Sequence, residues 1–498
     1  MRVRSAVLSS TLTVFAVTLV TGSGIASGSA TTRASGRARV EAFHAAQHAR
    51  LVWRGEHPSP AIPAPPNAAR LPAVTVRAVK QISQDTLTAT TGIEPDTQVE
   101  PDIDVDPYNE AHVVAVVQNG RDPNGGAQTI AYSTSQDGGK TWVTGSLPGV
   151  TTSTGGPYNR ASDPAVAFGP DGSAYAVSLV FNTNNNSDGV AVSRSPDGGV
   201  TWNQPVFAQT DNGGTDDKEW ITVDDFASSP HRGRIYIAWD AAGGGGQPIY
   251  LRYSDDKGQT WSARITVSPA TSSTIGARPV VQPNGDLTMV YEKGANIVAQ
   301  TSHDGGATFA SAVTVAQDKA SDPFDERAGS DLPSVAVDPT TGVMYVVWGD
   351  TRFRSDGTMD AVLSRSTNGG TTWSAPVRTN QDSTTDGLTH MTPAVAAYGG
   401  AVDVAYRTRQ KSGSSYSNLV GMRFIRSTDG GLTFGGEITV GQPADLTWSA
   451  RAGGKFLGDY MGVVASAHAI HPVWCRSFQP PTTEQYHQTT WSAAVLPS

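Results

Sequence analysis

The sequence predicts an all-β fold built from repeated four-stranded antiparallel sheets, and two interleaved repeats carry this prediction. The first is an eight-residue pattern, Ser-x-Asp-x-Gly-x-Thr followed by an aromatic residue, present in six copies. The second is an apolar strand, a turn rich in Asp, Pro, Asn and Gly, and another apolar strand, and it occurs seven times. Sheets that repeat at intervals of about sixty residues are typical of a single β-propeller, in which each repeat forms one blade.

The eight-residue pattern predicts a hairpin turn. Its Asp or Asn side chain can accept hydrogen bonds from backbone amides two residues on, the following glycine supplies a positive φ, and the Thr-aromatic pair suits the start of a strand. A calcium loop would need carboxylates at alternate positions and a closing Glu, which no copy has, so no metal is expected. The turn residues of the six copies are Asp137, Asp197, Asp256, Asp304, Asn368 and Asp429.

The second repeat sets the number of blades. Its copies span residues 101–117, 164–177, 220–239, 279–291, 333–348, 393–406 and 460–474. The seventh copy has no eight-residue turn after it, and only residues 488–495 offer it a further strand. Residues 74–83 resemble the outer strands and are expected to complete this last blade, which would close the ring and remove its open edges. Seven blades are preferred, and six blades with a stray hairpin remain the alternative.

The eight-residue turns resemble the Asp box, or bacterial neuraminidase repeat, of the sialidase-like β-propeller superfamily. The resemblance covers roughly residues 80–498 and implies that the turns are part of the scaffold, away from the active site. It implies the fold firmly and the reaction only weakly, because one fold can carry many activities.

The N-terminal region predicts export. Arg2 and Arg4 precede an apolar run over residues 6–20, and small residues follow it, as in a secretory signal peptide, which we place at residues 1–30. Residues 31–73 are rich in Ala, Arg and Pro and are interpreted as a linker or pro-region, so the propeller domain is expected over residues 74–498. The apolar run is too short for a comfortable membrane span. We therefore expect a secreted, extracellular monomer without a membrane span.

Composition narrows the possible partners. Residues 1–80 hold ten Lys or Arg and two Asp or Glu, so the remainder has 26 basic and 43 acidic residues. This acidic balance argues against nucleic acid as a partner. The single cysteine, Cys475, excludes an internal disulfide framework. The sequence contains no nucleotide fingerprint or phosphate loop, and no cofactor is expected.

Strand order predicts the position of a functional site. If the eight-residue turns join the third and fourth strands, each first strand begins on the opposite face, around the central channel. The residue directly before each first strand differs between copies, which marks positions that packing does not fix. These residues are Glu100, Asp163, Glu219, Arg278, Leu332, Thr392 and Asp459.

The resemblance implies particular roles for residues on this face. A sialidase-type site uses an arginine cluster to bind a carboxylate, a tyrosine nucleophile assisted by a glutamate, and an aspartic acid as proton donor. Arg278, Arg352 and Arg407 could form the cluster, Tyr460 with Glu219 the nucleophile pair, and Asp163 the acid. The Arg-Ile-Pro-type motif of such enzymes is absent, because the corresponding residues are Val99-Glu100-Pro101-Asp102.

Two functions from different classes follow. The first is a secreted sialidase-like glycoside hydrolase acting on exposed glycans, of exo-α-sialidase type, which the acids near one channel mouth favour. The second is a non-catalytic propeller that binds glycan or protein through the same face, which the missing arginine motif favours.

Overall fold

The computed structural model describes residues 74–184, 187–211, 213, 215–242, 246–481 and 483–497. The chain divides into two compact units, residues 1–34 and 35–498, and every described residue belongs to the second. The predicted signal peptide (1–30) and linker (31–73) lie outside the described residues. Within the described ranges, none of the chain forms a helix that is long and apolar enough to cross a membrane.

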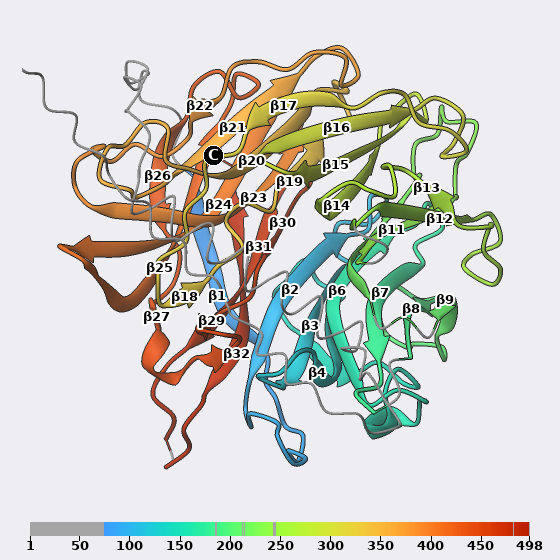
Figure 1. The fold of residues 1–498 in the computed structure, drawn as a ribbon, viewed down its shortest axis with the longest axis horizontal. Helices are drawn as coiled ribbons and strands as arrows, with labels where there is room; N and C mark the ends of the chain where they lie inside the picture. The colour runs from blue at the N-terminus through green and yellow to red at the C-terminus, as the bar shows by residue number, and fades with distance from the viewer. Residues whose placement is uncertain are drawn as a thin grey trace, which may run out of the picture. The chain divides into compact units, whose positions relative to one another are not determined.

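The described chain consists mainly of antiparallel strands and the loops between them, with two short 3-10 turns, η1 (Thr152–Thr154) and η2 (Leu446–Trp448) (Figure 1). Its main sheets comprise seven four-stranded units, each running from an innermost first strand to an outermost fourth strand. The first three units are β2 (Gln98–Val105), β3 (Val113–Arg121), β4 (Ala127–Ser135) and β5 (Val143–Ser146); β6 (Arg160–Phe168), β7 (Ala174–Phe181), β8 (Asp188–Ser195) and β9 (Val206–Asp211); and β10 (Asp216–Val223), β11 (Ile235–Ala241), β12 (Ile249–Ser254) and β13 (Ile265–Thr266). The next three are β14 (Thr274–Val281), β15 (Leu287–Lys293), β16 (Asn296–Ser302) and β17 (Val313–Gln317); β19 (Ser334–Val337), β20 (Met344–Asp350), β21 (Asp360–Ser366) and β22 (Val377–Arg378); and β23 (Leu388–Tyr398), β24 (Ala401–Ser412), β25 (Ser415–Ser427) and β26 (Gly435–Thr439). The last unit is β30 (Gly462–Ala465), β31 (Ile470–Ser477), β32 (Gln488–Leu496) and β1 (Thr75–Ser83).

Smaller strands lie between these units. β27 (Ala444–Asp445) pairs with β25, while β18 (Glu326–Arg327), β29 (Lys455–Phe456) and β28 (Ala450–Arg451) form a separate three-stranded sheet. This small sheet joins the loop before β19 to the loop before β30, which are more than a hundred residues apart in the chain.

The first and last strands of the described chain share one sheet. β1 pairs antiparallel with β32, with Thr75 opposite Leu496 and Ser83 opposite Thr490. The prediction that residues 74–83 complete the last unit is therefore confirmed. The pairing covers the edge that β32 would otherwise expose.

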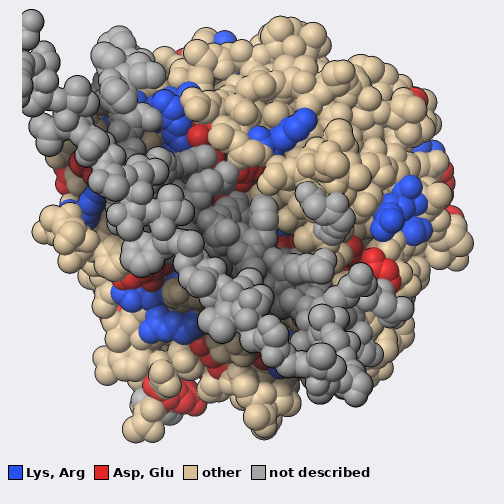
Figure 2. Space-filling model, in the orientation of Figure 1, with Lys and Arg blue, Asp and Glu red and all other residues tan. Residues whose placement is uncertain are grey.

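The first strands form a closed ring. Each contacts the first strand of the next unit, and β30 contacts β2. Large apolar side chains fill the spaces between neighbouring units; Trp239, for example, is fully buried between the second and third units, against Tyr175 and Val177. Sheets that pack face to face around a central axis define a β-propeller, so the predicted fold class is confirmed. On the face drawn in Figure 2, the charged side chains of the described residues lie in small separate groups.

The turns predicted from the eight-residue pattern, here called box turns, are held by their acidic residue. In the last copy, Asp429 Oδ1 accepts hydrogen bonds from Ser427 Oγ at 2.7 Å and from the Thr433 amide at 2.9 Å. The amide is thus four residues on, not two as the turn chemistry suggested. The aromatic residue of five copies is half-buried and only Phe434 is buried, because the turn leads into the outermost strand of each sheet.

Removing this carboxylate should destabilise the fold without affecting any activity. We expect Asp429→Ala to lower the free energy of unfolding by about 1–2 kcal/mol, because Ser427 and the Thr433 amide lose their acceptor. Thr428→Ala is the matched control, since Thr428 is exposed beside it. Urea unfolding of both variants measures the difference, and equal stabilities would show that the carboxylate does not hold the turn.

Candidate active site at the channel end opposite the box turns

The box turns lie at the same end of the sheets as the turns between first and second strands. The Gly138 amide in a box turn donates to Ala111 O at 2.9 Å, and the Gly430 amide donates to Gly400 O at 3.0 Å. The first strands therefore begin at the opposite end. Along β2, Glu100 lies near that opposite end and Asp104 near the box end, about 13 Å apart at the rise of a strand.

A β-bulge shapes the beginning of five first strands. The register in β2 shifts between Val99 and Asp102, and β6, β10, β14 and β23 shift in the same way. The first bulged residue has a positive φ, which costs roughly 1–2 kcal/mol for a residue other than glycine. A bulge re-aims side chains, so these residues are placed by the bulge rather than by strand alternation. They are Glu100 (58°), Asp163 (46°), Lys218 (51°), Gly276 (72°) and Thr392 (50°).

Three of these positions meet at a single ammonium group. Lys218 Nζ lies 2.8 Å from Asp163 Oδ1, 2.8 Å from Asp459 Oδ2 and 3.4 Å from Glu100 Oε1. All four residues are buried. Residues from the first strands of three units and from the loop before β30 thus form one compact cluster, here called the Lys218 cluster.

Further hydrogen bonds fix the carboxylates. Ser162 Oγ donates to Asp163 Oδ2 at 2.7 Å, and the Gln118 side-chain amide donates to Glu100 Oε2. Arg327, on β18, donates from Nε to Asp459 Oδ1 at 2.8 Å. The three carboxylates of the cluster therefore have separate supports in addition to Lys218.

The cluster holds its groups in unequal protonation states. Burial, and then the charge of Asp163, raise the pKa of Glu100 to about 8. Burial alone would lower the pKa of Lys218, but the charges of Asp163, Asp459 and Glu100 outweigh it and hold that pKa well above its usual range. Near neutral pH, Glu100 can donate a proton while Lys218 stays charged.

A small polar recess borders the cluster. Its volume is about 10 Å³, enough for one water-sized group. The residues around it are Glu100, Gln118, Arg121, Gly126, Ser162, Asp163, Asp217, Lys218, Arg327 and Phe456. Glu100 and Asp163 face this recess together, whereas Asp459 and Tyr460 are not part of its lining.

Of the predicted acids, the structure places Asp163 in the cluster and Glu219 outside it. Glu219 is the second bulged residue of β10, and its carboxylate accepts a hydrogen bond from the Leu179 amide in β7. Burial raises its pKa well above the usual range. The predicted register was wrong by one residue at Glu219 and by two at Arg278, because it aligned the starts of the apolar strands and ignored the bulge. Lys218 and Gly276 hold the positions equivalent to Glu100.

Tyr460 lies in the channel beside the cluster. Its hydroxyl donates to Pro164 O at 2.9 Å, and its ring meets the Trp220 ring edge-on at 5.3 Å. Burial raises the pKa of Tyr460 well above its usual range. The hydroxyl that was predicted to act as nucleophile is thus engaged in a structural hydrogen bond.

The three predicted arginines have different partners. Arg278 stacks on the Trp220 ring at 3.2 Å, Arg352 donates to Asp350 Oδ2 at 2.6 Å, and Arg407 donates to Gly458 O at 2.9 Å. None of the three is part of the lining of the recess at the Lys218 cluster. The structure therefore does not gather them around that recess.

Sequence reasoning missed Lys218, and it placed Arg327 in a long loop on the same face without giving it a role in the site. Aligning the repeats on the residue after each bulge, Asp102, Ala165 and Trp220, would have placed Lys218 beside Glu100 and Asp163. Nothing local marks Arg327, because it reaches the cluster through the small sheet.

Acidic groups with the spacing of metal ligands lie elsewhere. In the group Asp360, Asp382 and His390, ligand atoms lie within 4.8 Å of one another. Asp360 there is ion-paired with Arg354 at 2.7 Å and with Arg378 at 2.8 Å, so arginines already neutralise it.

Comparison with known proteins gives likenesses at low identity only. No family model and no curated protein matches the chain. A protein of unknown function from Dyadobacter fermentans is 15% identical over 84% of this chain and 99% of its own, with a TM-score of 0.44. The α-L-arabinanase of Penicillium chrysogenum is 12% identical over 85% and 98%, with a TM-score of 0.43. The intramolecular trans-sialidase of Ruminococcus gnavus is 13% identical over 84% and 98%, with a TM-score of 0.42. A function for this chain must therefore rest on its own residues.

Proposed function

We propose that the protein is a glycoside hydrolase in which Glu100 and Asp163 cleave a glycosidic bond at the recess of the Lys218 cluster. The observation that carries this proposal is a pair of carboxyl groups that border one recess, of which one has a raised pKa and the other faces an ammonium. Environments that separate the protonation states of two nearby acids are typical of acid and base or nucleophile roles.

The spacing of the two acids favours a retaining mechanism. Their nearest oxygens lie 2.8 and 3.4 Å from the same nitrogen, so they are no further apart than the sum of these distances. This limit on the nearest oxygens is compatible with the ~5–5.5 Å between the carboxyl groups of retaining enzymes.

In this mechanism Glu100 donates its proton to the leaving oxygen as the glycosidic bond breaks. Asp163 forms a bond to the anomeric carbon, giving a glycosyl ester. In the second step Glu100 takes a proton from water, whose oxygen attacks the same carbon and releases Asp163. Lys218 positions Asp163 through their 2.8 Å ion pair.

Replacing Glu100 should remove the proton donor. With Glu100→Gln we expect turnover of glycosides with poor leaving groups to fall by about 10²- to 10⁴-fold. Nitrophenyl glycosides, whose leaving groups need no proton, should lose much less. In the wild type, activity should fall as the pH rises through about 8, where Glu100 loses its proton, and the variant should lack this decline.

Turnover is measured on a panel of aryl glycosides, beginning with sialosides. Asp163→Ala is measured on the same panel, with and without added azide. Azide can occupy the space of the missing carboxylate and attack the anomeric carbon directly, so a glycosyl azide of inverted configuration is expected if Asp163 is the nucleophile. Glu110→Gln, at the other channel end, is the control for the loss of a carboxylate. Unchanged rates in both Glu100→Gln and Asp163→Ala, at unchanged melting temperature, would refute the assignment.

A second candidate function is a non-catalytic module that binds glycan through this face. It is favoured by the pairing of the carboxylates with Lys218 and Arg327, and by a recess with room for only one water-sized group. Glycan binding on an array without turnover of any glycoside would support it.

The proposal includes export to the extracellular medium. It rests on the basic residues Arg2 and Arg4, the apolar run over residues 6–20 and the small residues after it. N-terminal sequencing of the protein from culture medium should find a start between residues 24 and 31. An intact N-terminus in the cell fraction would contradict it.

A further inference from the structure

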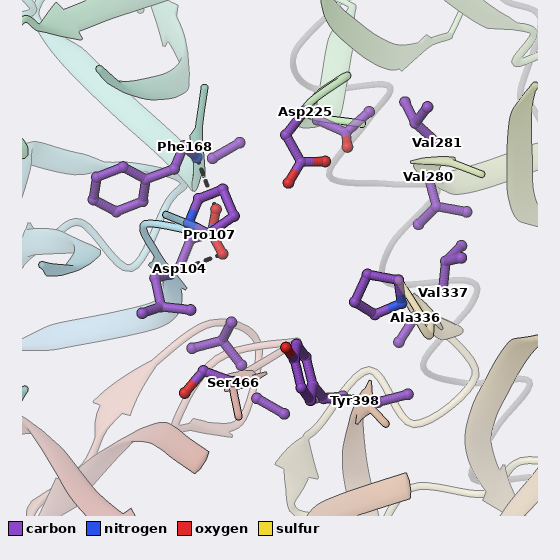
Figure 3. A pocket seen from close by; sticks show the side chains of 18 of the residues that line it. Asp104, Pro107, Phe168, Asp225, Val280, Val281, Ala336, Val337, Tyr398 and Ser466 are labelled. Atoms are coloured by element: carbon purple, nitrogen blue, oxygen red, sulfur yellow. Dashed lines mark hydrogen bonds between the residues drawn. The ribbon is translucent and has the colours of Figure 1, made fainter. Parts of the chain in front are cut away.

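The other end of the channel holds a much larger cavity. Its volume is about 540 Å³, and residues from the ends of all the first strands, β2, β6, β10, β14, β19, β23 and β30, line it (Figure 3). It shares no lining residue with the recess of the Lys218 cluster. Ligand pockets of proteins commonly measure about 300–1,000 Å³. This box-end cavity therefore has the size of a binding site of its own.

The lining combines apolar walls with charge of one sign. Most of it is valine and alanine, supplemented by the rings of Tyr108, Phe168, Phe226 and Tyr398. The charged side chains in the lining are Asp104, Asp106, Glu110 and Asp225, and among the described residues that line it there is no Lys, Arg or His. An apolar space with several carboxylates and no basic group is complementary to a cation with an apolar body.

The four carboxylates differ in how many other residues they contact through hydrogen bonds or ion pairs. Asp104 accepts the Phe168 amide at 2.7 Å, Asp106 lies 3.5 Å from His112 Nδ1, and Glu110 accepts Ser466 Oγ at 2.8 Å. For Asp225, by contrast, no other described residue donates a hydrogen bond to the carboxylate, which Figure 3 shows directed into the open cavity. Two basic groups outside the lining contact lining residues: Arg232 donates to the Tyr108 hydroxyl at 3.1 Å, and His468 Nδ1 lies 3.2 Å from Glu110 Oε1.

Two tyrosine rings, of Tyr108 and Tyr398, are part of the lining of this cavity. Tyr398 points into the same space from the opposite side of the cavity (Figure 3). Tyr108 reaches the loop of Asp225 through a hydrogen bond from its hydroxyl to Asp225 O at 2.8 Å. Aromatic faces next to a carboxylate attract ammonium groups, with the strongest effect where water is excluded.

We propose that the box-end cavity binds a small organic cation. Its ammonium group lies against the Asp225 carboxylate on the Tyr108 side of the cavity, and its apolar part extends toward the Tyr398 ring, between Val280, Val337 and Val395. This site is separate from the proposed hydrolase site. The guanidinium of Arg278 stacks on the rings of Trp220 and Tyr460 in the channel, and none of these three residues lines the box-end cavity.

The test compares two probes of nearly equal shape, benzylamine and benzyl alcohol, by isothermal titration with the whole protein. We expect saturable binding of benzylamine that is at least about tenfold tighter than that of benzyl alcohol. Asp225→Asn should abolish this preference while leaving the affinity for benzyl alcohol unchanged. Asp255→Asn, which removes the same charge from an exposed position, should bind both probes as the wild type does.

A second variant tests the location without removing charge. Ala336→Phe places a ring among the lining residues and should weaken both probes, with folding checked by the melting temperature. Equal affinity of the two probes for the wild type, absence of benzylamine binding, or an Asp225→Asn variant that keeps the preference would each overturn the proposal. Because no glycoside is involved, these results do not depend on whether the hydrolase proposal holds.

Discussion

Replacing Lys218 with methionine is expected to lower the free energy of unfolding by about 3–5 kcal/mol at pH 8, the usual cost of leaving buried charges without their partner. The side chain is buried and lies within 3.4 Å of carboxylates from Glu100, Asp163 and Asp459. Methionine fills similar space, so the loss reports the missing charge rather than a cavity. Urea unfolding at fixed pH measures it.

The sign of the pH dependence follows from the same contacts. The pKa of Lys218 is raised in the folded protein, so its stabilisation is complete below the unfolded pKa of about 10.4 and is lost only as the pH rises through the folded value. In Lys218→Met, protonation of the carboxylates relieves their repulsion, so the difference from wild type should shrink between pH 8 and pH 5. Lys257→Met, which removes an exposed lysine, should cost less than about 1 kcal/mol at both pH values. A Lys218→Met variant as stable as this control would show that the three carboxylates do not depend on Lys218.

Deleting residues 74–83 is expected to cause the second large effect, loss of cooperative folding and aggregation. The deletion removes all of β1 and exposes the backbone edge of β32 along the paired stretch from Thr490 to Leu496. It also removes Ile82, which is buried against Val105 and Val473. An unpaired strand edge is a template for association between molecules.

Size-exclusion chromatography and thermal unfolding measure this effect. Arg77→Ala is the control, because Arg77 lies in the same strand with an exposed side chain. A monomeric deletion variant with the melting temperature of the wild type would mean that the other strands close the ring without β1.

The sequence by itself determined the strands and most of their order. Strand periodicity and turn chemistry act over a few residues, so the box turns and the paired apolar runs could be located without a structure. The closure by residues 74–83 was also predictable, because the last repeat lacks an outermost strand and these residues match the pattern of the others.

Only the tertiary structure decided the contents of the channel. A bulge inserts one residue and re-aims the next side chain. Lys218 therefore lies at the channel end where Glu219 was predicted. No local signal in the residues Asp217-Lys218-Glu219-Trp220 fixes that register. The Tyr460 hydroxyl donates to Pro164 O, which is 296 residues away in the chain, and Arg327 donates to Asp459, which is 132 residues away. Such contacts depend on how whole sheets are arranged around the axis, and for this reason the strands of this protein could be predicted from the sequence while its central cluster could not.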